Sequence, residues 1–225
     1  MSAPFPPLHV SAAEGYALWA DTWDATPSPV AALEHRALLP WIAGLQPRCV
    51  IDVGCGTGRW TARWAGAIGI DASPAMLAVA ACKPGLAGRL AVADAAALPV
   101  ASGAAELVLC ALTFGHIRNQ AGALAEFARI LEPGGILILT DFHPAAAAQG
   151  WRRTFRRDGQ VYELENHSYT LGHLREIAPG LVLRDTAEAT IGEPERPLFE
   201  RAGRPELYAA ACAKPAVLLT RWVRV

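Results

Sequence analysis

The sequence lacks the features of a membrane-spanning, secreted or nucleic-acid-binding protein. It has no uninterrupted apolar run of the roughly 18–20 residues that a membrane span needs. The opening segment MSAPFPPLHV has no basic region followed by an apolar stretch, so we expect no signal peptide. The formal net charge is −1, which gives no excess of positive charge for a nucleic-acid or anionic-membrane partner. We therefore expect a cytoplasmic protein without a nucleic-acid partner.

Paired cysteines are also missing. The five cysteines are scattered, form no Cys-X-X-Cys pair and are odd in number. This pattern is typical of reduced thiols and not of a disulfide framework or a zinc site. Asp141, His143 and His167 have metal-binding side chains, but their spacing matches no metal-ligand pattern. We predict no metal, and the sequence leaves the oligomeric state open.

Apolar residues, by contrast, are abundant and regularly arranged. They make up 52% of 225 residues, while charged residues make up 18%, which suits one domain with a large core. From Cys49 onward, apolar runs such as CVIDV, AIGID, LAVAD, LVLCALTF and GILILTDF alternate with helical segments. Continuous apolar strands that alternate with helices predict a doubly wound parallel sheet.

Several helix boundaries are marked in the sequence. Ser28-Pro29 and Ser73-Pro74 each combine a capping side chain with a proline at the first helical position. We also expect a short helix in RWTARW and a helix around Leu124–Leu131. The Pro133-Gly134-Gly135 stretch predicts a sharp stop before the next strand.

The two ends of the chain do not follow the strand–helix alternation. Residues 1–46 are helical in pattern and rich in tryptophan, and residues of about 143–178 are rich in Arg, His and aromatic side chains. The segments LVLRDTAEATI and AVLLTRWVRV predict two late strands that form an antiparallel hairpin at a sheet edge. The predicted fold is therefore α/β and Rossmann-like, with a doubly wound, mostly parallel seven-stranded sheet whose last strand is antiparallel.

A glycine-rich loop follows the first strand of this sheet, in VIDVGCGTGRW. The dinucleotide fingerprint GxGxxG would need a third glycine where this chain has Arg59. The loop instead reads GxGxG, with Asp52 two positions before its first glycine. A phosphate disfavours a close carboxylate, whereas an amino group favours one. The loop therefore predicts a ligand with an amino-bearing end and no pyrophosphate.

Two more carboxylates end the next two strands. Asp71 closes AIGID, where a carboxylate can accept hydrogen bonds from both ribose hydroxyls, and Asp94 closes LAVAD, where it can accept from an adenine amino group. The carboxyl ends of such strands face the crevice in which open α/β sheets bind ligands. Three acids in this order around a GxGxG loop favour a nucleoside ligand over solvated strand ends.

The segment from Val50 to Phe142 resembles the class I S-adenosylmethionine-dependent methyltransferases, in particular the small type 11 (ubiquinone/menaquinone-methyltransferase-like) group. The resemblance rests on VIDVGCGTGRW, GIDASPAML, VADAAALP, LVLCALTFGHI and FARILEPGGILILTDF. It implies S-adenosylmethionine as cofactor, S-adenosylhomocysteine as product, and residues 1–46 as a helical N-terminal lid on a methyltransferase domain of residues 47–225. The insertion at about 143–178 then forms part of the acceptor pocket. The helix in RWTARWAG is shorter than is usual in the family.

The resemblance also implies which residues bind the cofactor. Asp52 and the backbone at Gly54 and Gly56 would hold the methionine part, Asp71 the ribose, and Met76 and Asp94 the adenine. The full predicted cofactor set is Asp52, Gly54, Cys55, Gly56, Gly58, Asp71, Ala72, Met76, Asp94, Ala95, Leu112 and, from the lid, Tyr16.

Methyl transfer is an in-line displacement that needs alignment and sometimes the removal of a proton. His116, after the fourth strand, is the first catalytic candidate, as general base or as orienter of the acceptor; a histidine that caps a nearby helix is the alternative. His143, after the fifth strand, is the second candidate. The predicted acceptor-pocket residues are Trp151, Arg152, His167 and Tyr169.

The leading hypothesis is a methyltransferase for a small-molecule acceptor. The run WRRTFRR, if helical, would place its arginines in pairs on two faces, for a carboxylate, a phosphate or RNA, or as a solvated basic surface. Methylation of RNA or another macromolecule is therefore one alternative. The other two are a protein that binds S-adenosylmethionine without methyl transfer and a nicotinamide oxidoreductase, which Arg59 disfavours.

Overall fold

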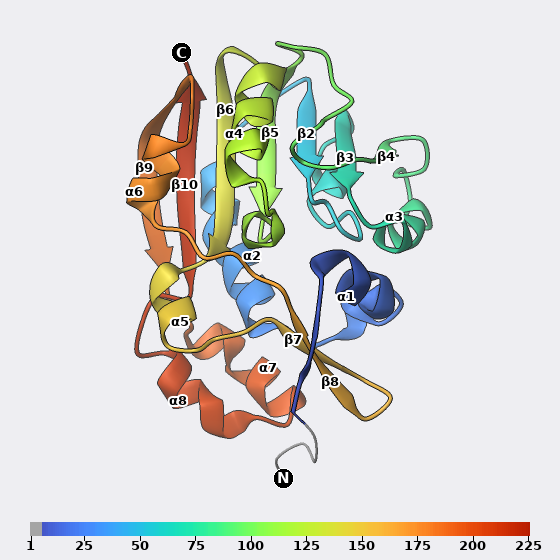
Figure 1. The fold of residues 1–225 in the computed structure, drawn as a ribbon, viewed down its shortest axis with the longest axis vertical. Coiled ribbons are helices and arrows are strands. Elements are labelled where there is room, and N and C mark those ends of the chain that lie inside the picture. The colour runs from blue at the N-terminus through green and yellow to red at the C-terminus, as the bar shows by residue number, and fades with distance from the viewer. Residues whose placement is uncertain (1–5) are drawn as a thin grey trace.

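The computed structural model describes residues 6–225, so residues 1–5 of the predicted lid segment lie outside the described residues. Its main element is a seven-stranded sheet of β2 (Val50–Val53), β3 (Ala67–Asp71), β4 (Leu90–Val92), β5 (Ala105–Ala111), β6 (Leu131–Phe142), β9 (Leu181–Ala189) and β10 (Val217–Arg224). The strand order is β4-β3-β2-β5-β6-β10-β9 (Figure 1). Strands β2 to β6 pair in parallel, and β10 is antiparallel to β6 and β9. The predicted sheet, with its antiparallel last strand, is confirmed.

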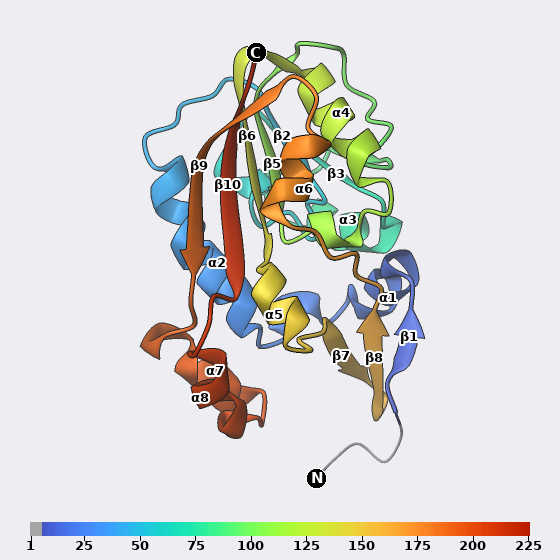
Figure 2. The same cartoon turned by 60° about the vertical axis from the view of Figure 1, so that its left-hand side comes forward.

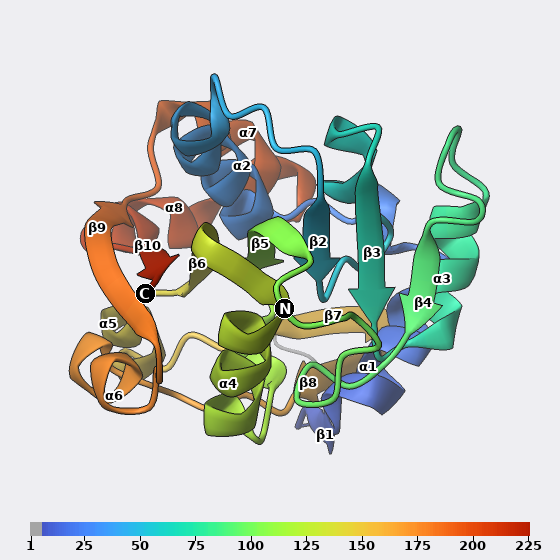
Figure 3. The same ribbon diagram turned by 90° about the horizontal axis from the view of Figure 1, so that it is seen from above.

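Helices cover both faces of this sheet (Figure 3). Helices α4 (Gln120–Ile130) and α6 (Leu171–Glu176) lie on one face, where Phe127 and Leu174 are fully buried against the strands. Helices α2 (Pro29–Ile42), α7 (Arg196–Arg201) and α8 (Tyr208–Ala211) lie on the other. The strands are therefore buried on both sides, which explains their continuous apolar sequences.

The predicted serine caps are present. The Ser28 hydroxyl accepts a hydrogen bond from the Ala31 amide at 3.2 Å at the start of α2. The Ser73 hydroxyl accepts one from the Met76 amide at 3.4 Å at the start of α3 (Pro74–Ala81). Each cap is followed by a proline at the start of the helix, so these two boundaries were readable from the sequence.

Two local predictions in the parallel part were wrong. The helix expected in RWTARW is reduced to a three-residue 3₁₀ turn, η2 (Thr61–Arg63), in which the Thr61 hydroxyl bonds to Asp52, and β3 begins at Ala67. The stretch predicted as a stop before the strand lies within the bounds of β6. There, pairing with β5 jumps from Leu131 to Ile136, so these residues bulge out of the ladder.

The N-terminal segment was predicted to be helical, but it also contributes a strand. Strand β1 (Leu8–Val10) pairs in parallel with β8 (Gln160–Leu164), which pairs with β7 (Thr154–Arg157), and helix α1 (Ala12–Trp19) and the 3₁₀ turn η1 (Trp23–Ala25) follow β1. The helical interpretation of the arginine run was also wrong. Asp158 and Gly159, with φ of 50° and 78°, form the two-residue turn of the β7–β8 hairpin.

The small sheet, with α1 and α5 (Pro144–Ala148), lies below the carboxyl ends of the parallel strands (Figures 1 and 2). The N-terminal segment and the insertion after β6 are thus two parts of one cover over the crevice of the large sheet. Within residues 6–225, no helix has the length and apolarity needed to cross a membrane.

Glu34 of α2 ties the glycine loop to the centre of the molecule. Its carboxylate is fully buried and accepts hydrogen bonds from Arg59 Nη2 at 2.7 Å and from Thr140 Oγ1 at 3.0 Å. We expect Glu34→Gln to lower the free energy of unfolding by about 1–3 kcal/mol, because the substitution weakens a buried, charge-assisted contact. Urea unfolding followed by circular dichroism measures this difference.

The exposed Glu200→Gln is the matched control, since Glu200 is 3.9 Å from Arg196 on the surface of α7. Its effect should stay within about 0.5 kcal/mol. Equal effects of the two substitutions would show that Glu34 does not stabilise the loop.

Candidate active site

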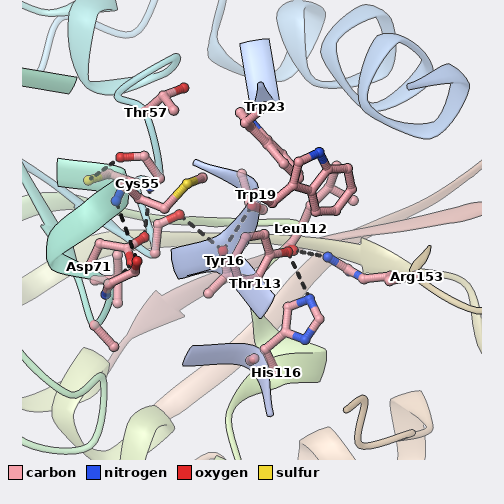
Figure 4. Close-up of a pocket in the computed structure, with 18 of the residues that line it drawn as sticks. Tyr16, Trp19, Trp23, Cys55, Thr57, Asp71, Leu112, Thr113, His116 and Arg153 are labelled. Atoms are coloured by element: carbon pink, nitrogen blue, oxygen red, sulfur yellow. Dashed lines mark hydrogen bonds between the residues drawn. The ribbon is translucent and has the colours of Figure 1, made fainter. Parts of the chain in front are cut away.

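The carboxyl ends of the parallel strands and the N-terminal segment enclose a cavity of about 660 Å³ (Figure 4). It opens where the strand order reverses, between β2 and β5, which is where open α/β sheets bind ligands. Tyr16, Trp19 and Trp23 line it from the N-terminal segment. The other predicted cofactor residues that line it are Asp52, Gly54, Cys55, Gly56, Asp71, Ala72, Met76, Asp94, Ala95 and Leu112.

Two glycines of the loop shape this cavity. Gly54 and Gly56 have φ of 71° and 55°, which side chains rarely adopt. A Cβ on Gly54 would overlap the Thr113 side chain, and one on Gly56 would lie 3.2 Å from Met76 Cε. Gly58 has another role: a Cβ there would overlap Leu86, so this glycine allows α3 and its following turn to pack closely.

Asp52 lies at the floor of the cavity, 1% exposed, and accepts a hydrogen bond from Thr61 Oγ1 at 2.6 Å. Burial raises the pKa of Asp52 to about 6, in spite of this hydrogen bond. A cation placed beside the carboxylate would favour its ionised form. Asp52 is therefore suited to receive a positively charged group.

Asp71 and Asp94 are held by backbone amides. Asp71 accepts hydrogen bonds from Gly56 N and Ser73 N, both at 2.8 Å, through different oxygens. Each oxygen keeps acceptor capacity, because a carboxylate oxygen has two lone pairs. Burial raises the pKa of Asp71. Asp94 is exposed and accepts from Ala96 N at 2.8 Å, so both acids are oriented before any ligand arrives.

Leu112 has an unusual backbone for a non-glycine residue, with φ of 55°. Its amide donates to Thr140 O at 2.8 Å, and its carbonyl accepts a hydrogen bond from the Arg153 guanidinium. A left-handed leucine persists only where its surroundings fix it, and such positions cluster at functional sites. The left-handed backbone of Leu112 thus directs its own carbonyl toward Arg153 at the cavity wall.

Tyr16 and His116 contact each other across the cavity, from α1 and the 3₁₀ turn η3 (Phe114–His116). His116 Nδ1 lies 2.8 Å from Glu165 O, and because a carbonyl only accepts, Nδ1 carries the proton. Nε2, 3.0 Å from Tyr16 Oη, then accepts a hydrogen bond from the tyrosine hydroxyl. Burial, and after it the charge of Arg153, lowers the pKa of His116 to about 3. The geometry therefore favours an orienting role over that of a general base.

His143, the second predicted catalytic residue, is engaged elsewhere. Its Nδ1 accepts a hydrogen bond from Ala145 N at 3.1 Å, which caps α5, and its Nε2 lies 3.2 Å from Glu188. Among the residues that the structure describes, His143 is not part of the cavity wall. The structure brings only His116 of the two to the cavity.

The predicted acceptor-pocket residues are divided by the structure. Arg152 lines this cavity and a second one beside it, Trp151 and Tyr169 line only the second, and His167 lies 3.6 Å from Glu165. In the described part of the chain His167 lines neither of the two cavities. Over residues 6–225 no group of three or more His, Cys, Asp and Glu side chains is arranged to hold a metal ion.

Arg153 is the residue that sequence reasoning missed. It is 9% exposed, and its guanidinium binds Asp141 and the Leu112 carbonyl and lies 4.4 Å from the centre of the Phe142 ring. Burial is the largest single influence and opposes its charge, but the Asp141 carboxylate together with Tyr16 and Tyr169 raises the pKa of Arg153. The Asp158-Gly159 turn signal could have revealed it, because strand periodicity then puts residues 153 and 155 on the same inward face.

The lowered pKa of His116 makes stability depend on pH. Between pH 6.5 and about 3 the unfolded chain protonates this histidine and the folded chain does not, so its contribution to stability is present above pH 6.5 and is lost as the pH falls. Asp52, with a raised pKa, acts in the opposite sense below pH 6.

Comparison with His116→Asn isolates the histidine. From pH 7 to pH 5 the unfolding free energy of the wild type should fall more steeply than that of the variant, by at most about 1.4 kcal/mol per pH unit. Denaturant titrations across this range measure both slopes. Parallel profiles would show that His116 is not buried as a neutral ring.

Residues 51–139 match the family model described as "Methyltransferase domain". The chain is 37% identical over 107 residues to the demethylmenaquinone methyltransferase of Thermus thermophilus, covering 44% of this chain and 49% of that protein. It is 30% identical over 139 residues to the malonyl-[acyl-carrier protein] O-methyltransferase of Methylococcus capsulatus, covering 55% of this chain and 50% of that protein. The chain thus spans about half the length of the curated relatives it matches.

Solved structures share the fold at low identity. A crystal structure of an S-adenosylmethionine-dependent methyltransferase from Mesorhizobium loti aligns with a TM-score of 0.62 at 22% identity, covering 85% of this chain and 100% of that one. The [4+2]-cyclase SpnF aligns with a TM-score of 0.64 at 18% identity, covering 97% of both chains. The family match therefore makes residues 51–139 similar to a methyltransferase domain, and the glycine loop and the strand-end acids Asp52, Asp71 and Asp94 all lie within these residues.

Proposed function

We propose that this chain transfers the methyl group of S-adenosylmethionine to a small-molecule acceptor. One observation carries the proposal: Asp52, Asp71 and Asp94, from the ends of three adjacent strands, line the same cavity as the GxGxG loop. A nucleoside that bears an amino acid needs three acceptors of this kind, for an ammonium, a ribose and an adenine amino group. The match to a methyltransferase domain supports the same ligand.

The methionine end would bind over β2. Asp52 supplies a buried carboxylate for the ammonium, and the missing side chains at Gly54 and Gly56 give a ligand close access to the loop backbone. The cavity would hardly admit a side chain at either position, because Thr113 and Met76 fill the space beside them. These residues therefore fit the group.

The nucleoside end would bind over β3 and β4. Asp71 is fixed by two backbone amides with acceptor capacity left for ribose hydroxyls, and Met76 is a buried apolar wall suited to a purine face. Asp94, at the exposed end, would accept from the adenine amino group. Ala72 and Ala95 leave room between these contacts.

Bound S-adenosylmethionine supplies a methyl group on a sulfonium sulfur, which an acceptor atom takes by in-line displacement. The chain's own contribution is alignment and the exclusion of water, for which Trp19 and Trp23 close the cavity from the N-terminal side. Tyr16 and the neutral His116 would orient the acceptor or the methionine end through the tyrosine oxygen. His143 and His167 have no part in this proposal.

Two observations support a small acceptor. The curated relatives are named for methylation of demethylmenaquinone and of the malonyl group of an acyl-carrier protein. Three of the four arginines in the run have acidic partners, since Arg152, Arg153 and Arg157 lie within 4 Å of Glu163, Asp141 and Asp21, so only the exposed Arg156 adds uncompensated basic surface there. A cytoplasmic location and the division into a lid of residues 1–46 and a domain of residues 47–225 stay predictions.

Thermal unfolding with S-adenosylhomocysteine, S-adenosylmethionine and NADH tests the cofactor. A ligand at about 100 times its dissociation constant adds roughly 2.7 kcal/mol, so both adenosyl ligands should raise the midpoint by several degrees and NADH should not. Asp71→Asn should remove most of this shift, while Asp158→Asn, in an exposed turn, should keep it. A shift with NADH alone would contradict the proposal, and binding without turnover in an acceptor screen would favour the binding-only alternative.

The pKa of Asp52 predicts how cofactor binding depends on pH. The carboxylate is half protonated near pH 6, and only its ionised form attracts an ammonium. The dissociation constant of S-adenosylhomocysteine should therefore rise as the pH falls below about 6, approaching tenfold per unit. Calorimetric titration from pH 5 to pH 8 measures this slope. Asp52→Asn should bind more weakly at pH 8 and lose the slope, and an unchanged slope in the variant would exclude Asp52 as the titrating contact.

A further inference from the structure

Thr61 lies below the floor of the cavity at the strand ends. It begins the 3₁₀ turn η2, shortly after the last glycine of the loop, and it is fully buried. Asp52 lines the cavity, whereas Thr61 is not among the described residues that do. Any effect of Thr61 on a bound ligand must therefore pass through the residues that it contacts.

The contact that matters is the one between the Thr61 hydroxyl and the Asp52 carboxylate. Thr61 Oγ1 lies 2.6 Å from Asp52 Oδ2, and because an ionised carboxylate only accepts, the hydroxyl is the donor. Such a short distance is typical of a hydroxyl bonded to a charged carboxylate, a contact stronger than one between neutral groups. The hydroxyl engages one of the two carboxylate oxygens, so Asp52 keeps acceptor capacity for a ligand.

A missing side chain in the neighbouring strand makes room for this contact. Gly69 of β3 stands opposite Asp52 of β2 in the register of the sheet. A Cβ on Gly69 would lie 2.8 Å from Thr61 Oγ1 and 2.8 Å from Cys55 Sγ, which is closer than packed side chains allow. The hydroxyl therefore fills the space beside the carboxylate, and the close packing around it holds both groups in place.

The charged groups around Asp52 act on it less strongly than Thr61 does. Burial raises the pKa of Asp52 to about 6, and the Thr61 hydroxyl is the strongest influence in the opposite direction. Arg59 also favours the ionised form through its charge, but its terminal nitrogens donate to Glu34 and to a backbone carbonyl of α2. Asp71 opposes ionisation through its own charge.

Two cysteines near Asp52 stay neutral. Burial raises the pKa of Cys55 in the loop and of Cys110 in β5, so both remain thiols and add no charge beside the carboxylate. A buried carboxylate that lacks a hydrogen-bond donor favours its neutral form, which does not attract an ammonium. The charge on Asp52 therefore depends on the Thr61 hydroxyl.

We infer that Thr61 is a positioning residue for the cofactor: its hydroxyl keeps the Asp52 carboxylate charged and oriented for the ammonium of S-adenosylmethionine. The inference rests on the proposed function and adds to it a residue that acts only through Asp52. Without the hydroxyl, Asp52 takes up a proton at a higher pH and can turn away from the ligand. Cofactor binding should then be weaker at every pH, and it should begin to fail at a higher pH.

Calorimetric titration of S-adenosylhomocysteine from pH 5 to pH 8 compares the wild type with Thr61→Val, which keeps the shape of the side chain and removes its hydroxyl. Loss of a hydrogen bond to a charged group commonly shifts a pKa by about one unit, so the pH below which the dissociation constant rises should increase by about one unit. The variant should bind about twofold more weakly than the wild type at pH 8 and about tenfold more weakly at pH 6.

Thr61→Ser is the matched control, because it keeps the hydroxyl, and it should keep the wild-type pH profile. Thr220→Val removes another buried threonine hydroxyl, which donates to Leu139 O at 3.2 Å in the sheet, and it should also keep the profile. If Thr61→Val does not fold, Thr61→Ala compared with Thr61→Ser makes the same test, because these two variants differ only in the hydroxyl.

An unchanged pH profile in Thr61→Val, or an equal change in Thr61→Ser, would overturn the inference. The ¹³C signal of the Asp52 carboxyl, followed from pH 4 to pH 8 in the ligand-free protein, should have a higher midpoint in Thr61→Val than in the wild type. If the wild type binds S-adenosylhomocysteine and Thr61→Val changes neither the profile nor this midpoint, only the role of Thr61 is wrong. If the wild type does not bind it, the proposed function is wrong.

Discussion

The buried ion pair between Asp141 and Arg153 is the contact on which the arrangement of both cavities depends. Asp141 stands near the end of β6, and its carboxylate also accepts hydrogen bonds from the Gly115 and Phe142 amides. Arg153, from the insertion, is held by this carboxylate and by the Leu112 carbonyl. Removing either partner would leave an uncompensated charge in the interior, which typically costs 3–5 kcal/mol. The pair therefore fixes the insertion against the sheet and holds Arg153 where it lines both cavities.

The N-terminal segment is held against the glycine loop by polar contacts of its own. Asp24 accepts a hydrogen bond from Thr57 Oγ1 at 2.7 Å and lies 2.6 Å from Lys83 Nζ. Arg59, which departs from the dinucleotide pattern, donates to the Ala31 carbonyl at 3.1 Å as well as to Glu34. The residue that argued against a nicotinamide cofactor thus joins the loop to helix α2. These few side chains therefore connect the glycine loop to the N-terminal segment that covers the cavity.

The large sheet and the cavity at its strand ends were predictable because their signals are local. A buried parallel strand is apolar throughout, a capping serine before a proline marks a helix, and an acid at a strand end lies in the crevice by topology. The small sheet was predictable only in part: Asp158-Gly159 marks the β7–β8 hairpin, whereas β1 and β8 are distant in sequence and their pairing leaves no local pattern. The position of Arg153 depends on that sheet, so the sequence alone did not distinguish this buried arginine from its neighbouring arginines. His143 was misplaced for a similar reason: its order in the chain does not show which way its ring points.

The fold by itself does not decide the chemistry, since a [4+2]-cyclase shares it. What makes methyl transfer the proposed activity is the family match together with the side chains at the strand ends. A crystal structure of the chain with S-adenosylhomocysteine tests this most directly. We expect the ribose hydroxyls on Asp71, the ammonium beside Asp52, and the sulfur directed toward the part of the cavity lined by Phe142 and Arg153. A ligand bound with its sulfur turned away from Phe142 and Arg153, or bound without contacts to Asp52 and Asp71, would contradict the proposed activity.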